Sequence, residues 1–313
     1  MMNTPDYILK NSVHIGWDNS LAPISTIAPG DIVKFEAQDA SGGQLNAAST
    51  VEDVEKLDFE KVNPVTGPVY VEGAVPGDAL KITILSFDLS GWGWTAIIPG
   101  FGLLADQFTD PALHIWKYDT APGTLAEFKP GGKVPIKPFP GTIGNAPGAE
   151  GLHSVVNPRN VGGNMDTRGL CEGTILYLPV EVAGGLLSVG DAHAAQGDGE
   201  ICGTAIESPM NIALKIEVEK QMNLKFPRFT TPGPVCRHID GKGYDVTTGI
   251  GPDLMQCAKD AVAQMIDLIS KKYNMSTNDA YMLCSVCADL RIPEIVDMPD
   301  WIVSFNFPKS VFD

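Results

Sequence analysis

The stretch GTILYLPVEVAGGLLSVGDAHAAQGDGE, residues 173–200, decides the fold. Its first part is rich in β-branched and aliphatic residues and is bounded by glycine and proline, which is typical of β-strands. Runs of the same kind, DIVKFEA at 31–37, ALKITILSF at 79–87 and NIALKIEV at 211–218, are also separated by turn residues. The pattern predicts a mainly β, multi-stranded sandwich or barrel-like body over residues 1–222.

Between these runs, residues 91–151 are rich in glycine, proline and aromatic residues. We expect long ordered Gly/Pro loops there, and loops of that length usually carry function.

The last part of the chain, 223–313, has a different pattern. Apolar residues over 252–273 recur at spacings of three and four, which predicts an amphipathic helix with Pro252 and Asp253 at its start. Ser276 is placed to cap a second helix through about Leu290, and residues 301–307 can return as a strand. The sequence therefore predicts an α/β C-terminal segment with a helical hairpin, packed on the β body as one compact unit.

Composition limits the possible partners. The 313 residues carry 38 acidic and 22 basic side chains, a formal net charge of −16, and no basic run. This excludes nucleic acid as a partner and disfavours anionic membranes, whereas a neutral substrate is compatible. The start lacks the features of a secretory signal, and no apolar stretch approaches membrane-spanning length, so a cytoplasmic location is expected.

The cysteines are scattered, and only Cys284 and Cys287 form a CxxC, inside a helical pattern. We expect reduced core residues, with a structural zinc site as the alternative. The six are Cys171, Cys202, Cys236, Cys257, Cys284 and Cys287.

Ligand-type side chains concentrate in GDAHAAQGDGE, residues 190–200. Residues two apart on a strand share a face, so Asp191 and His193 continue the apolar stripe of Leu187 and Val189 into the interior. A buried carboxylate and imidazole are costly unless they are paired or bind a metal. Asp198 and Glu200 repeat the same two-residue spacing beyond the flexible Gly197.

A third ligand can come from DIVKFEAQDASGGQ at 31–44. There Asp39 ends an inward stripe of apolar residues, so we prefer it to Glu36, whose neighbours on its face are more polar. Each of these residues also has an ordinary structural explanation. The aspartates could form turns, the histidine could be a hydrogen-bonded core residue, and the other acidic side chains could be solvated. Of the other histidines, His14 and His153 could be second-shell or substrate groups, and His114 and His238 are read as structural.

Other catalytic classes lack their motifs. The chain has no G-x-S-x-G elbow and no Gly-Gly-Ser-Ser stretch, and Cys171 is followed by a predicted strand rather than a nucleophile turn. The run GGNMD at 162–166 matches neither a Walker loop nor a dinucleotide fingerprint, so by itself it predicts a turn.

Taken together, GGNMD at 162–166 and GDAHAAQGDGE at 190–200 resemble the central signature of the acetamidase/formamidase family. The segments at 14–44, 63–78 and 98–108 fit the order of that family too, so the resemblance covers nearly the whole chain. It implies a mainly β architecture with an α/β C-terminal part, hydrolysis of short aliphatic amides such as formamide and acetamide, and a homodimer. It also implies a divalent metal, zinc first, with calcium at a second site.

The resemblance also indicates site residues. The matching positions are Asp39, Asn164, Asp166, Asp191, His193, Gln196, Asp198 and Glu200. We expect zinc on His193, Asp191 and Asp39, with a water in the open position.

Roles for the remaining groups follow from the same mechanism. Glu200, ahead of Asp198 or Glu150, is expected to move the proton, and Asn164 or Gln196 to stabilise the oxyanion. A small apolar pocket for a formyl or acetyl group is expected from an aromatic loop, with His153 and Asp166 nearby. The aromatic residues are Trp92, Trp94 and Phe101, for which core or lid packing is the alternative.

Two other functions stay open at this stage. One is a lactamase that opens a small cyclic amide by the same chemistry. The other is a noncatalytic, calcium-stabilised β-sandwich that binds a small ligand, with Trp92 and Trp94 stacking on it.

Overall fold

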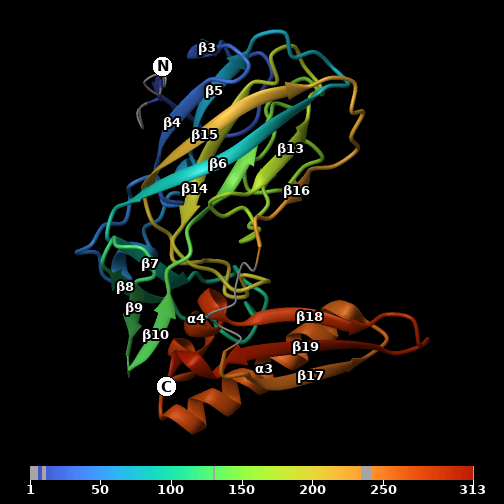
Figure 1. Cartoon of the computed structure of the whole chain (residues 1–313). Helices are drawn as coiled ribbons and strands as arrows, with labels where there is room; N and C mark the ends of the chain where they lie inside the picture. The colour runs from blue at the N-terminus through green and yellow to red at the C-terminus, as the bar shows by residue number, and fades with distance from the viewer. Residues whose placement is uncertain (1–5, 9–11, 130, 234–240, 313) are drawn as a thin grey trace.

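The computed structural model describes residues 6–8, 12–129, 131–233 and 241–312. Two β-sheets form the larger part of the molecule (Figure 1). The first sheet has the order β1 (Asp6–Ile8), β4 (Ile32–Ala37), β15 (Met210–Glu219), β6 (Ala79–Leu89), β13 (Ile175–Pro179) and β16 (Arg228–Thr230). The second has the order β12 (Gly162–Asn164), β11 (Phe139–Gly144), β14 (Leu187–His193), β5 (Val65–Val71) and β2 (Val13–His14), with β3 (Ser25–Ile27) also pairing with β5.

The two sheets bury a common apolar core. In β4 the buried residues alternate, so that Val33, Phe35 and Ala37 point inward, as the sequence predicts. They join one cluster with Leu187 and Val189 of β14 in the other sheet. The prediction of a mainly β, sandwich-like body is therefore confirmed.

The segment 91–151 contains more strands than its glycine and proline content suggested. β7 (Trp92–Ile97) pairs with β8 (Ala112–Lys117), β9 (Leu125–Phe128) pairs with β10 (Gly132–Pro135), and β11 lies in the second sheet. The glycines and prolines form the turns between these strands, while aromatic side chains such as Trp116 and Phe128 fill a core. Our expectation of loops alone was wrong here because the short strands have little apolar periodicity of their own.

The C-terminal segment forms an antiparallel sheet of β17 (Tyr244–Gly251), β19 (Trp301–Pro308) and β18 (Asp289–Glu294), with two helices, α3 (Leu254–Tyr273) and α4 (Thr277–Cys287). Asp253 caps α3 by accepting from the Gln256 amide, and Ser276 caps α4, as predicted. The second helix ends at Cys287 rather than near Leu290, because the chain from Asp289 onward pairs with β19.

The described cysteines are free and buried, in agreement with the reduced-core prediction. Cys236 and His238 lie outside the described residues. Within the described part of the chain, no helix is both long and apolar enough to cross a membrane.

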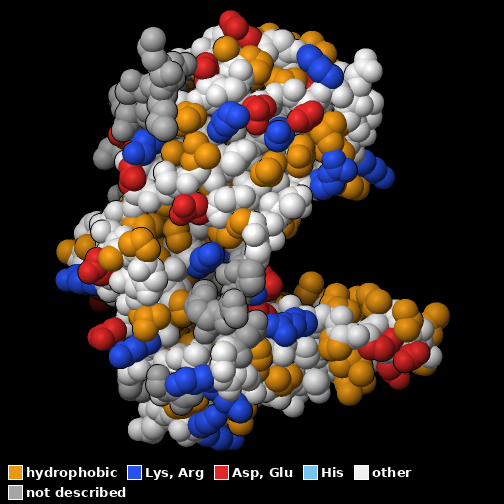
Figure 2. Space-filling view, in the orientation of Figure 1, with side chains coloured by type: hydrophobic (Ala, Val, Ile, Leu, Met, Phe, Trp, Pro, Cys, Tyr) orange, Lys and Arg blue, Asp and Glu red, His pale blue; other side chains and the backbone are white. Residues whose placement is uncertain are grey.

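The C-terminal sheet extends from the body like an arm (Figure 1), and Figure 2 shows a wide notch between the two. At the base of the arm, α3 and α4 share a core with β7, β8 and the segment after β14, so this junction is tightly packed. The described residues also include the short elements α1 (Val51–Val54), η1 (Phe59–Lys61) and η2 (Lys309–Val311).

Candidate active site

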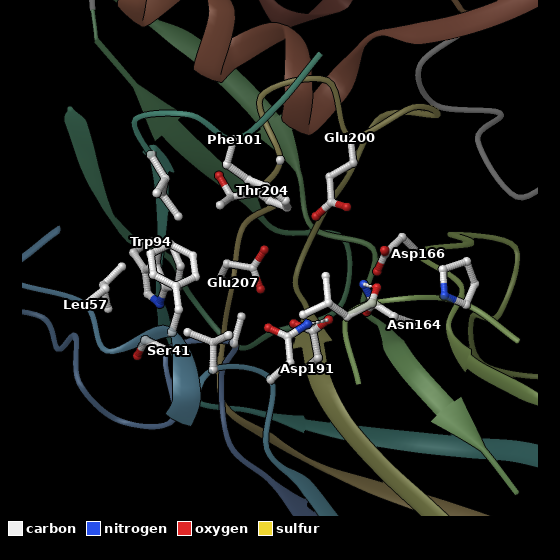
Figure 3. Close-up of a pocket in the computed structure, with 18 of the residues that line it drawn as sticks. Ser41, Leu57, Trp94, Phe101, Asn164, Asp166, Asp191, Glu200, Thr204 and Glu207 are labelled. Atoms are coloured by element: carbon white, nitrogen blue, oxygen red, sulfur yellow. Dashed lines mark hydrogen bonds between the residues drawn. The ribbon is translucent and has the colours of Figure 1, made fainter. Parts of the chain in front are cut away.

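A cavity of about 470 Å³ opens where β14 ends. Four carboxylates line it, Asp166, Asp191, Glu200 and Glu207, and Figure 3 shows them directed toward the same space. Aromatic and aliphatic side chains form the rest of the wall, among them Leu57 and Trp94 at the left of Figure 3 and Phe101 at its upper centre. The cavity is larger than the small pocket that we expected.

His193 lies behind the carboxylates, at the last residue of β14, and is fully buried. Its Nδ1 is 2.8 Å from Oε1 of Gln196, whose Nε2 donates to the Asp166 carbonyl oxygen at 2.7 Å. Because an amide oxygen only accepts, Nδ1 carries a proton. Gly141 lies so close beneath the ring that a Cβ there would be 2.8 Å from Nε2. The imidazole is thereby fixed with Nε2 toward the cavity.

Nε2 of His193 is surrounded by carboxylate oxygens. Asp191 Oδ1 lies at 3.3 Å, Glu207 Oε2 at 3.2 Å and Glu200 Oε1 at 4.0 Å. The other oxygen of Asp191 accepts from Asn63 Nδ2 and the Thr142 hydroxyl, each at 3.2 Å. Glu207 accepts from the Ala205 amide at 2.8 Å through Oε1.

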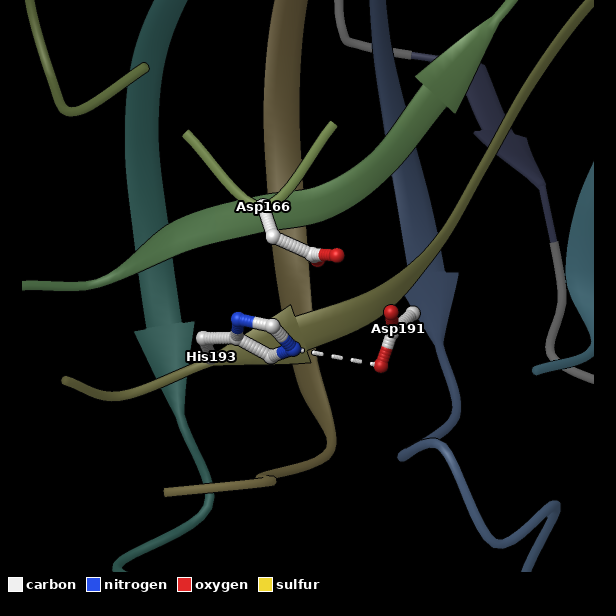
Figure 4. Close-up of side chains that lie close together, drawn as sticks. All are labelled: Asp166, Asp191 and His193. Atoms are coloured by element: carbon white, nitrogen blue, oxygen red, sulfur yellow. Dashed lines mark hydrogen bonds and ion pairs between the residues drawn. The ribbon is translucent and has the colours of Figure 1, made fainter. Parts of the chain in front are cut away.

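Two groups of side chains have ligand atoms within 4.8 Å of one another: Asp166, Asp191 and His193 (Figure 4), and His193, Glu200 and Glu207. Two oxygens in these groups, Asp166 Oδ1 and Glu207 Oε2, are buried without a hydrogen-bond partner. Neither Lys nor Arg is among the described residues that line the cavity. Buried, unpartnered acceptors around an imidazole nitrogen fit a divalent cation.

The pKa shifts reflect the same excess of negative charge. Burial and the charge of Asp191 raise the pKa of Asp166 to about 7, and burial raises that of Glu207 to about 8. Burial and the neighbouring Asp166 hold the pKa of Glu200 well above its usual range. Burial alone would lower the pKa of His193, but the Glu207 and Asp191 carboxylates raise it well above 6.5. The buried carboxylates therefore favour a positive charge between them, from a proton or a cation.

The backbone at three of the acids has an uncommon conformation. Asp166, Asp191 and Glu200 have φ values of 46°, 47° and 43°. A non-glycine residue in this left-handed region costs on the order of 1–3 kcal/mol, and such residues cluster at functional sites. The surrounding structure therefore holds these three carboxylates in place against a local cost.

Asp39 is buried, as predicted, but lies outside both ligand groups. Its Oδ1 accepts from the Ser41 amide, the Ser41 hydroxyl and Trp94 Nε1, the last at 2.9 Å. These donors satisfy the carboxylate locally and orient the Trp94 ring in the cavity wall.

Several other predicted residues do not line the cavity. Asp198 forms an ion pair with Arg168 at 3.1 Å, Glu150 is exposed, and His153 approaches the Ala149 carbonyl oxygen at 3.2 Å. Trp92 packs beside the small core cluster that contains Trp94.

His14 and His114 make structural contacts away from the cavity. His14 contacts the Ser188 hydroxyl at 2.8 Å, and His114 packs against Trp116 and Phe128. Neither lines the cavity.

Glu207 is the site residue that our sequence reasoning missed. It lies in an irregular segment before β15, where its backbone forms isolated bridges to both His193 and Trp94. The only local signal is an acidic residue at the end of the apolar run ICGTAIE, residues 201–207. Periodicity cannot place such a residue, because its position depends on pairing with distant strands.

Nearly the whole chain is similar to known amide hydrolases. The Acetamidase/Formamidase family model matches residues 4–157 and 148–313. A formamidase from Methylophilus methylotrophus is 28% identical over 96% of this chain and 89% of its own length.

Solved structures of related proteins have a similar fold. A gamma lactamase from Delftia acidovorans has a TM-score of 0.89 at 26% identity, covering 100% of this chain and 92% of that one. An acetamidase from Bacillus halodurans has a TM-score of 0.68 at 31% identity, covering 96% of each chain.

Proposed function

Because this chain belongs to the acetamidase/formamidase family, we propose that it is a metal-dependent amidohydrolase that converts a neutral amide to a carboxylate and ammonia. The observation that carries the proposal is the orientation of His193. Its protonated Nδ1 is held by Gln196, so Nε2 presents a lone pair to two carboxylate oxygens at 3.2 and 3.3 Å. That arrangement is repulsive unless a cation or a proton lies between them.

The residues that would hold the cation are His193, which both groups share, and the two carboxylates whose oxygens lie nearest to its Nε2, Asp191 from one group and Glu207 from the other. A nitrogen with two carboxylates suits zinc, and the additional carboxylates leave calcium as a candidate for a second site. When bound, a divalent cation polarises the amide carbonyl and lowers the pKa of a water. Gln196 keeps the imidazole in the required tautomer, as outer-shell partners do.

Proton transfer is assigned to Glu200. It is the most distant of the three carboxylates around Nε2, and its raised pKa suits a group that accepts a proton and returns it to the leaving amine. Burial and the negative charge of Asp166 raise that pKa. Asn164 lines the cavity and is the proposed donor to the developing oxyanion. In this scheme Asp39 orients Trp94 and leaves its expected ligand role to Glu207.

The direct test is ammonia release from formamide and acetamide by metal-free and metal-loaded protein. We expect activity that disappears with a chelator and returns with zinc. His193→Ala should lose metal and activity together, and excess metal should restore part of both. Full activity in chelated protein, or no ammonia from any amide, would reject the proposal.

Opening of a cyclic amide is the second candidate. It is favoured by one observation, the TM-score of 0.89 to a gamma lactamase, against 0.68 to an acetamidase. The products separate the two: a linear primary amide releases ammonia, whereas a lactam gives one amino acid and no ammonia.

We also propose that the chain forms a homodimer through its projecting sheet. Thr247 and Gly249 of β17 face α3, so Val246 and Ile250 point away from it and are exposed. Figure 2 shows apolar side chains along this arm. Light scattering should give twice the chain mass, and Ile250→Asp should shift the protein toward monomer.

A further inference from the structure

We infer that the preferred substrate is a neutral amide with a bulky apolar group, of about the size of a six-carbon chain, and that acetamide is a poor substrate. This inference rests on the proposed amide hydrolysis and specifies its substrate class. It comes from the volume, the walls and the charge of the cavity.

The volume is the first argument. Acetamide, at about the volume of four water molecules or roughly 120 Å³, would fill about a quarter of the 470 Å³ cavity. The remaining space would hold water against apolar side chains, which is unfavourable. A six-carbon primary amide occupies about twice the volume of acetamide and displaces much of that water.

The positions of the polar and apolar wall residues determine how an amide can be oriented in the cavity. Asp166 and Asn164 lie on one side of the cavity, Leu57 and Trp94 lie on the other, and Phe101 lies at the top between Trp94 and Glu200 (Figure 3). The amide group therefore has to face the acids, and its carbon substituent has to lie along the apolar side.

Two aromatic residues that line the cavity are exposed. Phe59, on η1, is 57% exposed, and Phe101, after β7, is 42% exposed. Phe101 is supported from below by Gly203, where a Cβ would lie 2.4 Å from the ring. Exposed rings that line a cavity are typical of surfaces that a ligand covers.

The charge of the cavity excludes ionic substituents of negative sign. Its described lining contains four carboxylates and no basic side chain, so an anionic group would be repelled and would lack a partner. The substituent is thus not anionic, and the apolar walls around Leu57, Trp94 and Phe101 disfavour a charged group of either sign there. The cavity does not distinguish an open chain from a ring, so a linear amide and a lactam of equal carbon number both satisfy its chemistry.

The experiment is a series of kcat/KM values for zinc-loaded protein with acetamide, propionamide, butyramide, hexanamide and caprolactam, and with succinamate as an anionic probe. Each buried methylene is worth roughly fourfold, and hexanamide has four more methylenes than acetamide, so its kcat/KM should exceed that of acetamide by roughly 250-fold. Caprolactam should also exceed acetamide. Succinamate should be the poorest substrate. Hydrolysis of the linear amides is measured as ammonia release, and hydrolysis of caprolactam is measured as formation of the ring-opened amino acid.

Variants test whether the aromatic residues of the cavity cause the preference for six-carbon amides. Phe59→Ala and Phe101→Ala should each lower the ratio of hexanamide to acetamide kcat/KM by roughly tenfold, mainly through KM. Phe226→Ala is the matched control, because Phe226 is 59% exposed but lies outside the cavity lining, and it should leave the ratio unchanged. Circular dichroism and zinc content confirm folding.

An acetamide kcat/KM equal to or above that of both six-carbon substrates would overturn the inference while leaving amide hydrolysis intact. Absence of product from every amide would instead reject the proposed function. A ratio that falls equally in the Phe226 control would show that the effect does not come from the cavity.

Discussion

Replacing Glu200 with glutamine tests the assignment of proton transfer. Glutamine keeps the shape of the side chain but cannot accept the proton. Burial and the neighbouring Asp166 raise the pKa of Glu200 well above its usual range, so this position favours a neutral side chain and the fold should persist with glutamine. Glu200 Oε1 is 4.0 Å from His193 Nε2, against 3.2 Å for Glu207, so metal binding should also persist.

The expected loss follows from the chemistry assigned to Glu200. General acid–base catalysis contributes about 10²- to 10⁴-fold, which is roughly 3–5 kcal/mol of transition-state stabilisation. The assay combines single-turnover ammonia release with zinc content by elemental analysis, using Glu207→Gln as the matched control. That control should lose zinc, whereas Glu200→Gln should keep it. Near-normal turnover in zinc-loaded Glu200→Gln would refute the assignment, and loss of its zinc would make Glu200 a ligand.

Three further predictions concern the groups around the site. Gln196→Leu should weaken zinc binding by roughly 10- to 100-fold, because Nδ1 of the histidine loses its partner, and a competitive zinc titration measures this. His114→Phe should flatten the pH dependence of stability. Burial lowers the pKa of His114 to about 4 in the folded protein. Between pH 4 and 6.5 the unfolded chain therefore binds one more proton at this residue than the folded protein does, and the folded protein loses stability as the pH falls. Melting temperatures measured across that pH range should fall less in the variant. Arg168→Ala should destabilise the protein by about 1–3 kcal/mol, because buried Asp289 loses its 2.7 Å ion pair and keeps the longer contact with Arg291, at 3.3 Å. Adding Asp289→Asn should recover part of that loss in urea unfolding, and equal unfolding midpoints in wild type and Arg168→Ala would contradict the prediction.

Much of the fold was predictable from the sequence, because its strands and helices have clear periodicity. The alternation in 32–37 and the three- and four-residue spacing in 254–269 are local signals, and both gave the buried faces correctly. The strands within 91–151 were missed, since their pairing is set by partners elsewhere in the chain rather than by their own pattern.

The site was predictable in part for the same reason. Asp191 and His193 share a strand, so their spacing predicted that they would meet, and they do. Asp39 ends an inward stripe as expected, but its local partners, Ser41 and Trp94, already satisfy it. Glu207 occupies the position beside the imidazole instead, through bridges between segments far apart in the sequence. Strand periodicity identifies which side chains are buried, but not which distant acids converge on one nitrogen.

The most direct test of the central claim is an anomalous-scattering map of zinc-loaded crystals. We predict a peak about 2.0–2.2 Å from His193 Nε2 and from carboxylate oxygens of Asp191 and Glu207. The same crystals treated with chelator should lose the peak, and the protein in solution should lose ammonia release in proportion. A zinc peak elsewhere in the molecule, or amide hydrolysis that continues without a peak at His193, would contradict the account.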